Sequence, residues 1–178
     1  VLKPVSGPYR AGWGHAELPV PVRTPLGGYG GRAAQAEGAL AIRVFVFKGP
    51  DQSCALLTAD LLLHGPETSQ ALRTAFSARA VPCVVLTASH THHGLGGFES
   101  SWPWTSVLGD FDESHRNTLV QASLQALDRA TNGIAPTRIG VARGRVDIGR
   151  NRTEVEGPVD HELVAVHLSN THGSAALW

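Results

Sequence analysis

Residues 83–97, with the sequence CVVLTASHTHHGLGG, join an apolar run to a histidine cluster and then to glycines. The run Cys83–Ala88 has the composition of a buried β-strand. His90 and His92 follow it, and in an extended segment these two side chains point to the same side. Two imidazoles at the end of a strand are typical of a zinc site. A histidine-rich surface loop is the alternative interpretation.

The segments before this cluster set its place in the fold. Residues 53–62 read as a strand, and a helix over 66–79 begins at Pro66, with Leu72 and Phe76 on its apolar stripe. A strand over 83–89 follows, so the order is a βαβ unit with two parallel strands. The sequence therefore predicts an α/β fold, a mixed β-sheet with flanking helices. The histidine cluster leaves the carboxyl end of a parallel strand, where ligands collect in open α/β sheets.

The rest of the chain adds strands and one further helix. Strands are predicted over 11–18, 40–47, 137–146, 162–168 and from 175, and 40–47 should form a hairpin with 53–62. A helix is predicted over 112–131, with Val120, Leu124 and Leu127 on one face and an αL cap at Gly133. Residues 1–10 and 98–111 show no hydrophobic periodicity typical of a helix or a strand. The latter, aromatic segment is interpreted as either a lid or apolar substrate wall, or a cover of the core.

Composition limits the class of protein. The chain has 178 residues, enough for one domain over 1–178 with a substantial core. Lys+Arg and Asp+Glu are 15 each, so the formal net charge is +0, which argues against a nucleic-acid surface or a polybasic membrane anchor. No apolar run approaches the roughly 18 residues of a membrane span, and no signal peptide is visible.

The two cysteines and a glycine-rich loop are two further features of the sequence. Cys54 and Cys83 both begin strand-like runs, where buried thiols are the usual state; a disulfide is the alternative if the two strands are neighbours. The loop 26–31, LGGYGG, lacks the lysine of a P-loop. Its glycines are expected to let the backbone run close beneath a pocket.

These motifs together resemble the N-terminal catalytic domain of the neutral/alkaline, non-lysosomal ceramidases. The resemblance runs from about residue 11 to 178 and rests on five segments in order: Gly28-Tyr29-Gly30, Ala41-Ile42-Arg43-Val44, Thr58-Ala59-Asp60-Leu61, the histidine cluster, and Gly149-Arg150-Asn151-Arg152-Thr153 followed by Asp160. Members of that family are zinc amidases that cleave ceramide to sphingosine and a fatty acid.

The resemblance implies roles for three residues. His90 corresponds to a zinc ligand, His92 to a side chain that stabilises the developing oxyanion, and Arg152 to an arginine bordering the active site. Zinc would polarise the amide carbonyl and lower the pKa of a bound water. The family's other ligands, a histidine, a glutamate and a tyrosine, would lie beyond Trp178, so the chain is expected to be the N-terminal part of a catalytic domain.

The chain departs from the family pattern in the cluster itself. His93 and Leu95 replace a serine and a proline. Asp60 is interpreted either as orienting a ligand histidine or as a turn residue. His64 leaves a strand end near the expected pocket, and no role is assigned to the remaining histidines, His15, His115, His161, His167 and His172.

The function implied is that of a ceramidase-like, zinc-dependent hydrolase acting on the amide bond of ceramide or a related N-acyl substrate in sphingolipid metabolism. The same resemblance implies a secreted or periplasmic enzyme with peripheral membrane contact for access to a lipid-like substrate. Two alternatives stay open: a catalytically inactive ceramidase-like domain that binds lipids or other ligands, and an unrelated metallohydrolase built on His-x-His.

Overall fold

The computed structural model describes residues 3–5, 9–28, 30–34, 39–155 and 157–177. The chain divides into two compact units, which are described separately. The larger unit comprises residues 10–134, and the smaller comprises residues 1–9 and 135–178. The organisation as a single domain stays a prediction.

The larger unit contains a mixed sheet in which four strands follow the order β5-β4-β3-β2. Their bounds are Arg10–Leu18 for β2, Leu40–Lys48 for β3, Ser53–Ala59 for β4 and Cys83–Ala88 for β5. β3 pairs antiparallel with β2 and β4, while β4 and β5 are parallel. The predicted hairpin and the βαβ unit are both confirmed.

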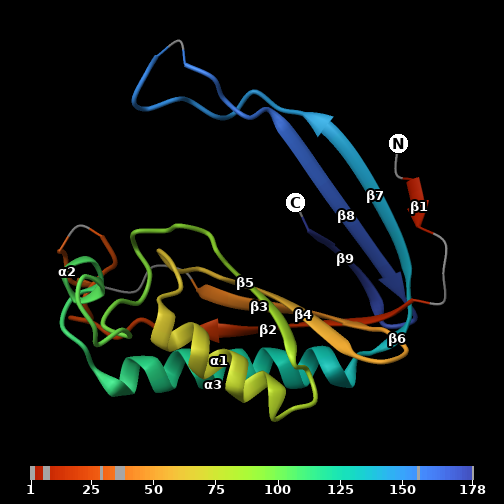
Figure 1. Cartoon of the computed structure of the whole chain (residues 1–178), viewed down its shortest axis with the longest axis horizontal. Helices are drawn as coiled ribbons and strands as arrows, with labels where there is room; N and C mark the ends of the chain where they lie inside the picture. Colours follow the sequence, from red (N-terminus) through yellow and green to blue (C-terminus); the bar gives the residue numbers. More distant parts are fainter. Residues whose placement is uncertain (1–2, 6–8, 29, 35–38, 156, 178) are drawn as a thin grey trace. The chain divides into compact units, whose positions relative to one another are not determined.

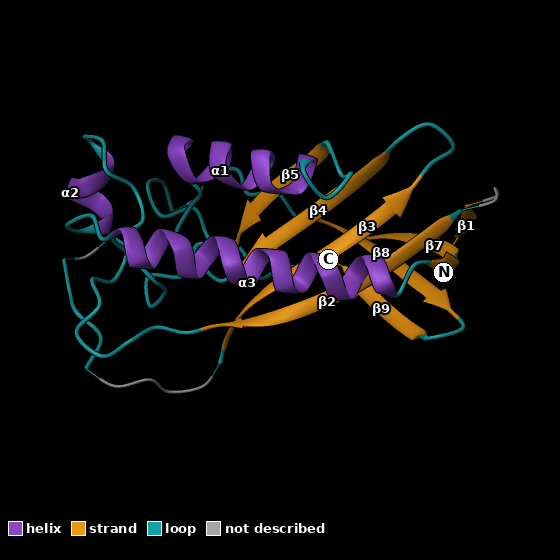
Figure 2. Cartoon of the chain, turned by 90° about the horizontal axis from the view of Figure 1, so that it is seen from below, coloured by secondary structure: helices purple, strands orange, loops and turns teal. Residues whose placement is uncertain are grey.

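Two helices, α1 (Pro66–Ser77) and α3 (Glu113–Asn132), cover one face of this sheet (Figures 1 and 2). Alternate β3 side chains point into the core because strand side chains alternate between faces, and Ile42, Val44 and Val46 are each fully buried. On α1 the predicted stripe of Leu72 and Phe76 is confirmed, since both are fully buried.

The apolar face of α3 differs from the prediction. Leu127 is buried as expected, but Val120 and Leu124 are only half-buried. The positions of closest packing are taken by smaller residues, among them Ala126 and Ala130. These face Gly12 and Gly14 of β2, where an added Cβ would lie 2.1 Å from the Ala130 carbonyl oxygen and 2.5 Å from that of Ala126. Glycines in the strand therefore permit the close approach of the helix.

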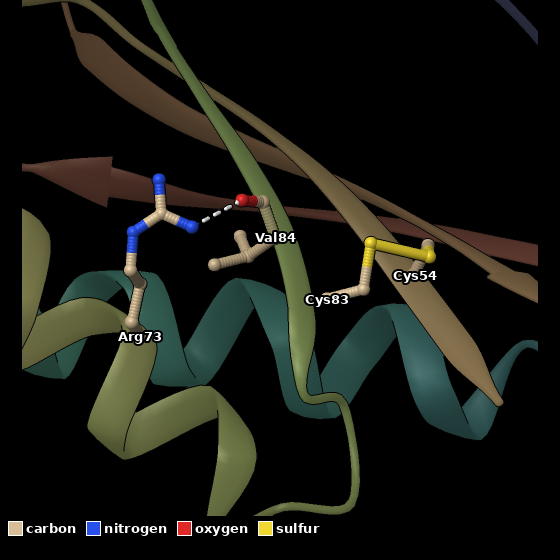
Figure 3. The surroundings of a disulfide bond; sticks show 4 residues. All are labelled: Cys54, Arg73, Cys83 and Val84. Atoms are coloured by element: carbon tan, nitrogen blue, oxygen red, sulfur yellow. Dashed lines mark hydrogen bonds between the residues drawn. A yellow bond between two sulfur atoms is a disulfide. The ribbon is translucent and has the colours of Figure 1, made fainter.

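Cys54 and Cys83 form a disulfide, which corrects the expectation of buried thiols (Figure 3). They are direct register partners in the parallel pair β4–β5, with Cα atoms 4.5 Å apart. Beside them Arg73 of α1 donates a hydrogen bond of 2.8 Å to the carbonyl oxygen of Val84. The disulfide and this bond fix β5 to its neighbour and to its crossover helix.

Several element boundaries differ from the predictions. β4 ends at Ala59 rather than at residue 62, because Leu61 donates to the Ala59 carbonyl oxygen in a tight turn. Gly133 has φ −90°, so α3 ends without the expected αL cap. Part of the segment expected to be irregular is a short helix, α2 (Trp104–Leu108), reached through a cis Trp102–Pro103 bond.

The smaller unit is an antiparallel sheet in the order β1-β7-β8-β9. Its strands are Lys3–Val5 (β1), Arg138–Arg145 (β7), Glu162–Asn170 (β8) and Gly173–Leu177 (β9). A two-residue strand, Ala135–Pro136 (β6), comes directly before β7 in the chain. β1 lies where an irregular lead-in was expected. None of the helices among the described residues is long and apolar enough to cross a bilayer.

Candidate functional site

The histidine cluster directly follows the carboxyl end of β5, and the parallel strand β4 ends at the same side of the sheet. Loops and the short helix α2 lie at this end of the sheet (Figure 2). The rings of His90 and His92 lie edge to face, with centroids 5.3 Å apart. The expected convergence of the two side chains is therefore present. The backbone that brings the two side chains together is not the extended segment that was predicted. His90 has φ +60°, a left-handed conformation uncommon for residues other than glycine.

Both rings are oriented by backbone carbonyl groups of neighbouring segments. His90 Nδ1 lies 2.9 Å from the carbonyl oxygen of Leu62, and His92 Nδ1 lies 3.1 Å from that of Gly27. A carbonyl oxygen can only accept, so each Nδ1 carries the proton. In the neutral ring the lone pair is then on Nε2, the arrangement in which histidines commonly bind metals.

The glycine-rich loop supplies the surface against which His92 rests. Gly28 has φ +102°, and an added Cβ would lie 2.2 Å from His92 Nδ1. Its amide donates to the Val107 carbonyl oxygen at 2.7 Å, which holds the loop in place. The predicted close approach of this loop is thus made against the His92 ring. Tyr29, part of the motif quoted above, lies outside the described residues.

The backbone after the histidines is held by further hydrogen bonds. The amide of Gly96 donates to the Pro25 carbonyl oxygen at 2.8 Å, and that of Gly97 donates to the Leu108 carbonyl oxygen at 2.7 Å. Leu26 and Leu95 form an isolated antiparallel bridge. The histidine turn and the glycine-rich loop are therefore tied together along several residues.

A buried carboxylate that the sequence did not reveal fixes the next segment. Glu99 is fully buried and accepts from the amides of Thr68 at 2.7 Å and Glu67 at 3.1 Å, so it caps the N-terminus of α1. Glu67 in turn accepts from the Ser100 amide and hydroxyl and pairs with Arg116. The bonds from Ser100, with that of Arg116, lower the pKa of Glu67 to about 2.

Three other residues considered from the sequence have defined surroundings. Asp60 accepts from the Ala41 amide at 3.0 Å and pairs with Arg43, which agrees with the turn role. His64 Nε2 lies 3.1 Å from the Thr87 carbonyl oxygen, and burial lowers the pKa of His64. His93 is exposed, and its amide donates to Thr91 Oγ1.

Arg152 lies in the smaller unit, on the long loop between β7 and β8, and is exposed. The Asn151 side chain organises this turn: its Oδ1 accepts from the amides of Thr153 at 3.0 Å and Glu154 at 2.9 Å. Proximity of Arg152 to the histidines stays a prediction, as does its role. Among the described residues there is no group of three or more His, Cys, Asp or Glu side chains that could hold a metal ion.

Two solved structures that share this fold are ceramidases. A crystal structure of neutral ceramidase from Pseudomonas aeruginosa superposes with a TM-score of 0.82 and 23% identity over 95% of this chain. The fold is that of a neutral ceramidase segment. A second structure, a ceramidase complexed with C2, gives a TM-score of 0.80 and 20% identity over 93% of this chain. The chain spans 30% and 29% of the lengths of these two proteins, and no family model matches it.

Proposed function

We propose that this chain is part of a ceramidase-like, zinc-dependent hydrolase that cleaves the amide bond of ceramide or a related N-acyl substrate. The observation that carries the proposal is the orientation of His90 and His92, whose Nδ1 atoms face backbone carbonyl groups while their rings lie 5.3 Å apart. The fold shared with neutral ceramidase supports the choice of reaction.

His90 is the residue proposed to bind zinc, through Nε2. The proton that the Leu62 carbonyl oxygen holds on Nδ1 fixes the tautomer this requires. A bound zinc ion would supply a Lewis acid for the amide carbonyl and lower the pKa of a coordinated water to about 7. Among the described residues, His90 is not part of a group of three or more His, Cys, Asp or Glu side chains that could hold the ion together.

His92 is proposed to accept the proton of the attacking water and then to stabilise the oxyanion. With Nδ1–H directed at the Gly27 carbonyl oxygen, the neutral ring has a lone pair on Nε2 and can accept a proton there. The resulting imidazolium can donate from Nε2 to the oxyanion that develops on the amide carbonyl oxygen. Arg152 is proposed to contribute a second positive charge, as the family resemblance implies. Hydrolysis adds water across the amide: the hydroxyl of the water bonds to the carbonyl carbon, the proton passes from His92 Nε2 to the amide nitrogen as the C–N bond breaks, and the products are a carboxylic acid and an amine.

The disulfide between Cys54 and Cys83 supports a location in an oxidising compartment, such as the cell exterior or a periplasm. The substrate is proposed to be lipid-like, with peripheral membrane contact for access.

The test is hydrolysis of a short-chain fluorescent ceramide by the native, full-length protein, with and without a zinc chelator. We expect release of the fatty acid and its loss on chelation. His92→Ala should retain zinc but lower kcat by about 10²–10³-fold, since it removes a group that acts on the transition state. A protein that hydrolyses no N-acyl substrate even with zinc present, and that binds the metal weakly or not at all, would instead be the inactive binding domain.

A further inference from the structure

His64 is a half-buried histidine that the proposed hydrolysis does not use. It lies between the end of β4 and the start of α1, directly before the Gly65 that precedes the helix. Its Nε2 atom is 3.1 Å from the carbonyl oxygen of Thr87. Thr87 is the second-last residue of β5, the strand that leads into the histidine cluster. His64 therefore links the chain beyond β4 to the strand that leads to His90.

The surroundings of His64 fix the position of its proton. A carbonyl oxygen can only accept, so Nε2 carries the proton and Nδ1 has the lone pair. Nδ1 is buried, and none of the described residues bonds to it. Burial lowers the pKa of His64, against the opposing effects of the bond to Thr87 and the negative charge of Glu99, so the ring is neutral at neutral pH. With one nitrogen bonded and the other buried, His64 is not itself a metal ligand.

Two hydrogen bonds join residues 62–64 to residues 87–90 in opposite directions. His64 Nε2 donates to the Thr87 carbonyl oxygen, and His90 Nδ1 donates to the Leu62 carbonyl oxygen at 2.9 Å. The Leu62 carbonyl group belongs to the planar peptide that it shares with Leu63, so it turns whenever Leu63 moves. The direction of this carbonyl group therefore depends on where Leu63 and His64 are held.

The bond to Thr87 is the polar contact that holds this peptide. The side chains of Leu62 and Leu63 contact the core, which places the two residues but does not direct the carbonyl group between them. Within the described part of the chain, the bond to Thr87 is the one hydrogen bond that Leu63 or His64 makes. Its loss would loosen the peptide after Leu62, and with it the acceptor that faces His90 Nδ1.

We propose that His64 is a positioning residue for the zinc ligand His90. Its bond to the Thr87 carbonyl oxygen holds the Leu62 carbonyl group against His90 Nδ1, which keeps the proton of His90 on Nδ1 and the lone pair on Nε2. The inference rests on the proposed function for the role of His90 as a ligand. The tautomer of His90, however, is a property of the zinc-free protein and can be measured separately.

Two amide substitutions separate the hydrogen bond from the polarity of the side chain. The amide nitrogen of glutamine corresponds in position to the Nε2 atom of histidine, so His64→Gln can still donate to the Thr87 carbonyl oxygen. The amide nitrogen of asparagine corresponds to Nδ1, so His64→Asn keeps an amide but loses the bond. His93→Asn is the matched control, because it makes the same change at an exposed histidine of the cluster.

The first measurement is ¹⁵N NMR of the native, full-length protein without zinc, labelled in the histidine rings, with the His90 signals assigned by their loss in His90→Ala. We expect His90 to carry its proton on Nδ1 in the wild type, in His64→Gln and in His93→Asn, and to show a mixture of both tautomers in His64→Asn. The inference would be overturned by a mixture already in the wild type, by an unchanged tautomer in His64→Asn, or by the same mixture in His64→Gln.

The second measurement is the dissociation constant for zinc, obtained by competition with a chromophoric chelator. We expect zinc binding to weaken by about 10–100-fold in His64→Asn, as is typical when a group that orients a metal ligand is lost, and to stay close to the wild-type value in His64→Gln. Equal affinities of wild type and His64→Asn would contradict the positioning role. A wild type that binds no zinc would refute the proposed function, and the His90 tautomer would then decide the present inference by itself.

A third variant guards against a loss of folding. His64→Leu also lacks the bond to Thr87, but it removes the buried nitrogen that has no partner, so it should melt close to the wild-type temperature. It should repeat the mixed tautomer of His64→Asn. A His64→Leu variant that keeps the His90 proton on Nδ1 would overturn the inference even if His64→Asn does not fold.

Discussion

Gly28 lies directly against the ring of His92: a Cβ on Gly28 would be 2.2 Å from His92 Nδ1. We predict that Gly28→Ala displaces this ring and breaks its bond to the Gly27 carbonyl oxygen. Loss of a group that orients a functional histidine typically costs about 10–100-fold in activity. The measurement is kcat for ceramide hydrolysis, with zinc content recorded alongside.

Gly30→Ala is the matched control for backbone strain. Gly30 also has a positive φ, +69°, but nothing lies within 4 Å of an added Cβ. Both substitutions should cost about 1–2 kcal/mol of stability through the left-handed conformation, and only Gly28→Ala should affect kcat strongly. Equal kcat values for the two variants would contradict the positioning of His92 by Gly28.

Glu67 should make the fold acid-sensitive. Hydrogen bonds from Ser100 and Arg116 lower the pKa of Glu67 from 4.5 to about 2. A carboxyl whose pKa is lower in the folded state stabilises the fold above its unfolded pKa and loses this contribution as pH falls through the folded one. We predict that the stability deficit of Glu67→Gln relative to wild type is largest near neutral pH and shrinks between about pH 4.5 and pH 2.

Thermal melts of wild type and Glu67→Gln across this pH range measure the stability deficit. In a Ser100→Ala background the pH dependence of this deficit should be smaller, because the Ser100 side chain is the largest cause of the lowered pKa of Glu67. A deficit independent of pH would show that Glu67 does not gain its low pKa from these partners.

The disulfide should contribute substantially to stability. It closes a loop with a sequence separation of 29 residues, which includes the whole of α1. Chain-entropy arguments give about 3–4 kcal/mol for a loop of this length. Reduction of the wild-type protein should lower the free energy of unfolding in urea by about this amount, whereas the Cys54→Ala/Cys83→Ala variant should not respond to reductant. A wild-type protein indifferent to reductant would contradict the assignment.

Local patterns in the sequence were sufficient to predict most of the larger unit. The strands over 40–47 and 83–89 follow from their β-branched, aromatic and apolar composition, and Pro66 begins α1 as its fixed φ favours. The parallel β4–β5 pair follows from the helix between them. The same adjacency made the disulfide conceivable, yet the choice between thiols and a bond depended on the register that pairs Cys54 with Cys83.

The features of the candidate site that the sequence did not predict depend on contacts with segments far away in the sequence. The carbonyl groups of Leu62 and Gly27, which orient the two histidines, have no signature in the sequence, because every residue carries a carbonyl. Glu99 gave no signal either: its role depends on the N-terminus of α1, about thirty residues earlier. The positive φ of His90 replaced the extended geometry that periodicity predicts.

The most direct test of the proposed function is the zinc content of the native, full-length protein and of two histidine variants. We predict about one zinc per polypeptide in the wild type, loss of that zinc in His90→Ala, and its retention in His93→Ala, where the exposed neighbouring histidine is removed. Substoichiometric zinc in the wild type, or unchanged zinc in His90→Ala, would contradict the assignment of His90 as a metal ligand and with it the proposed hydrolase.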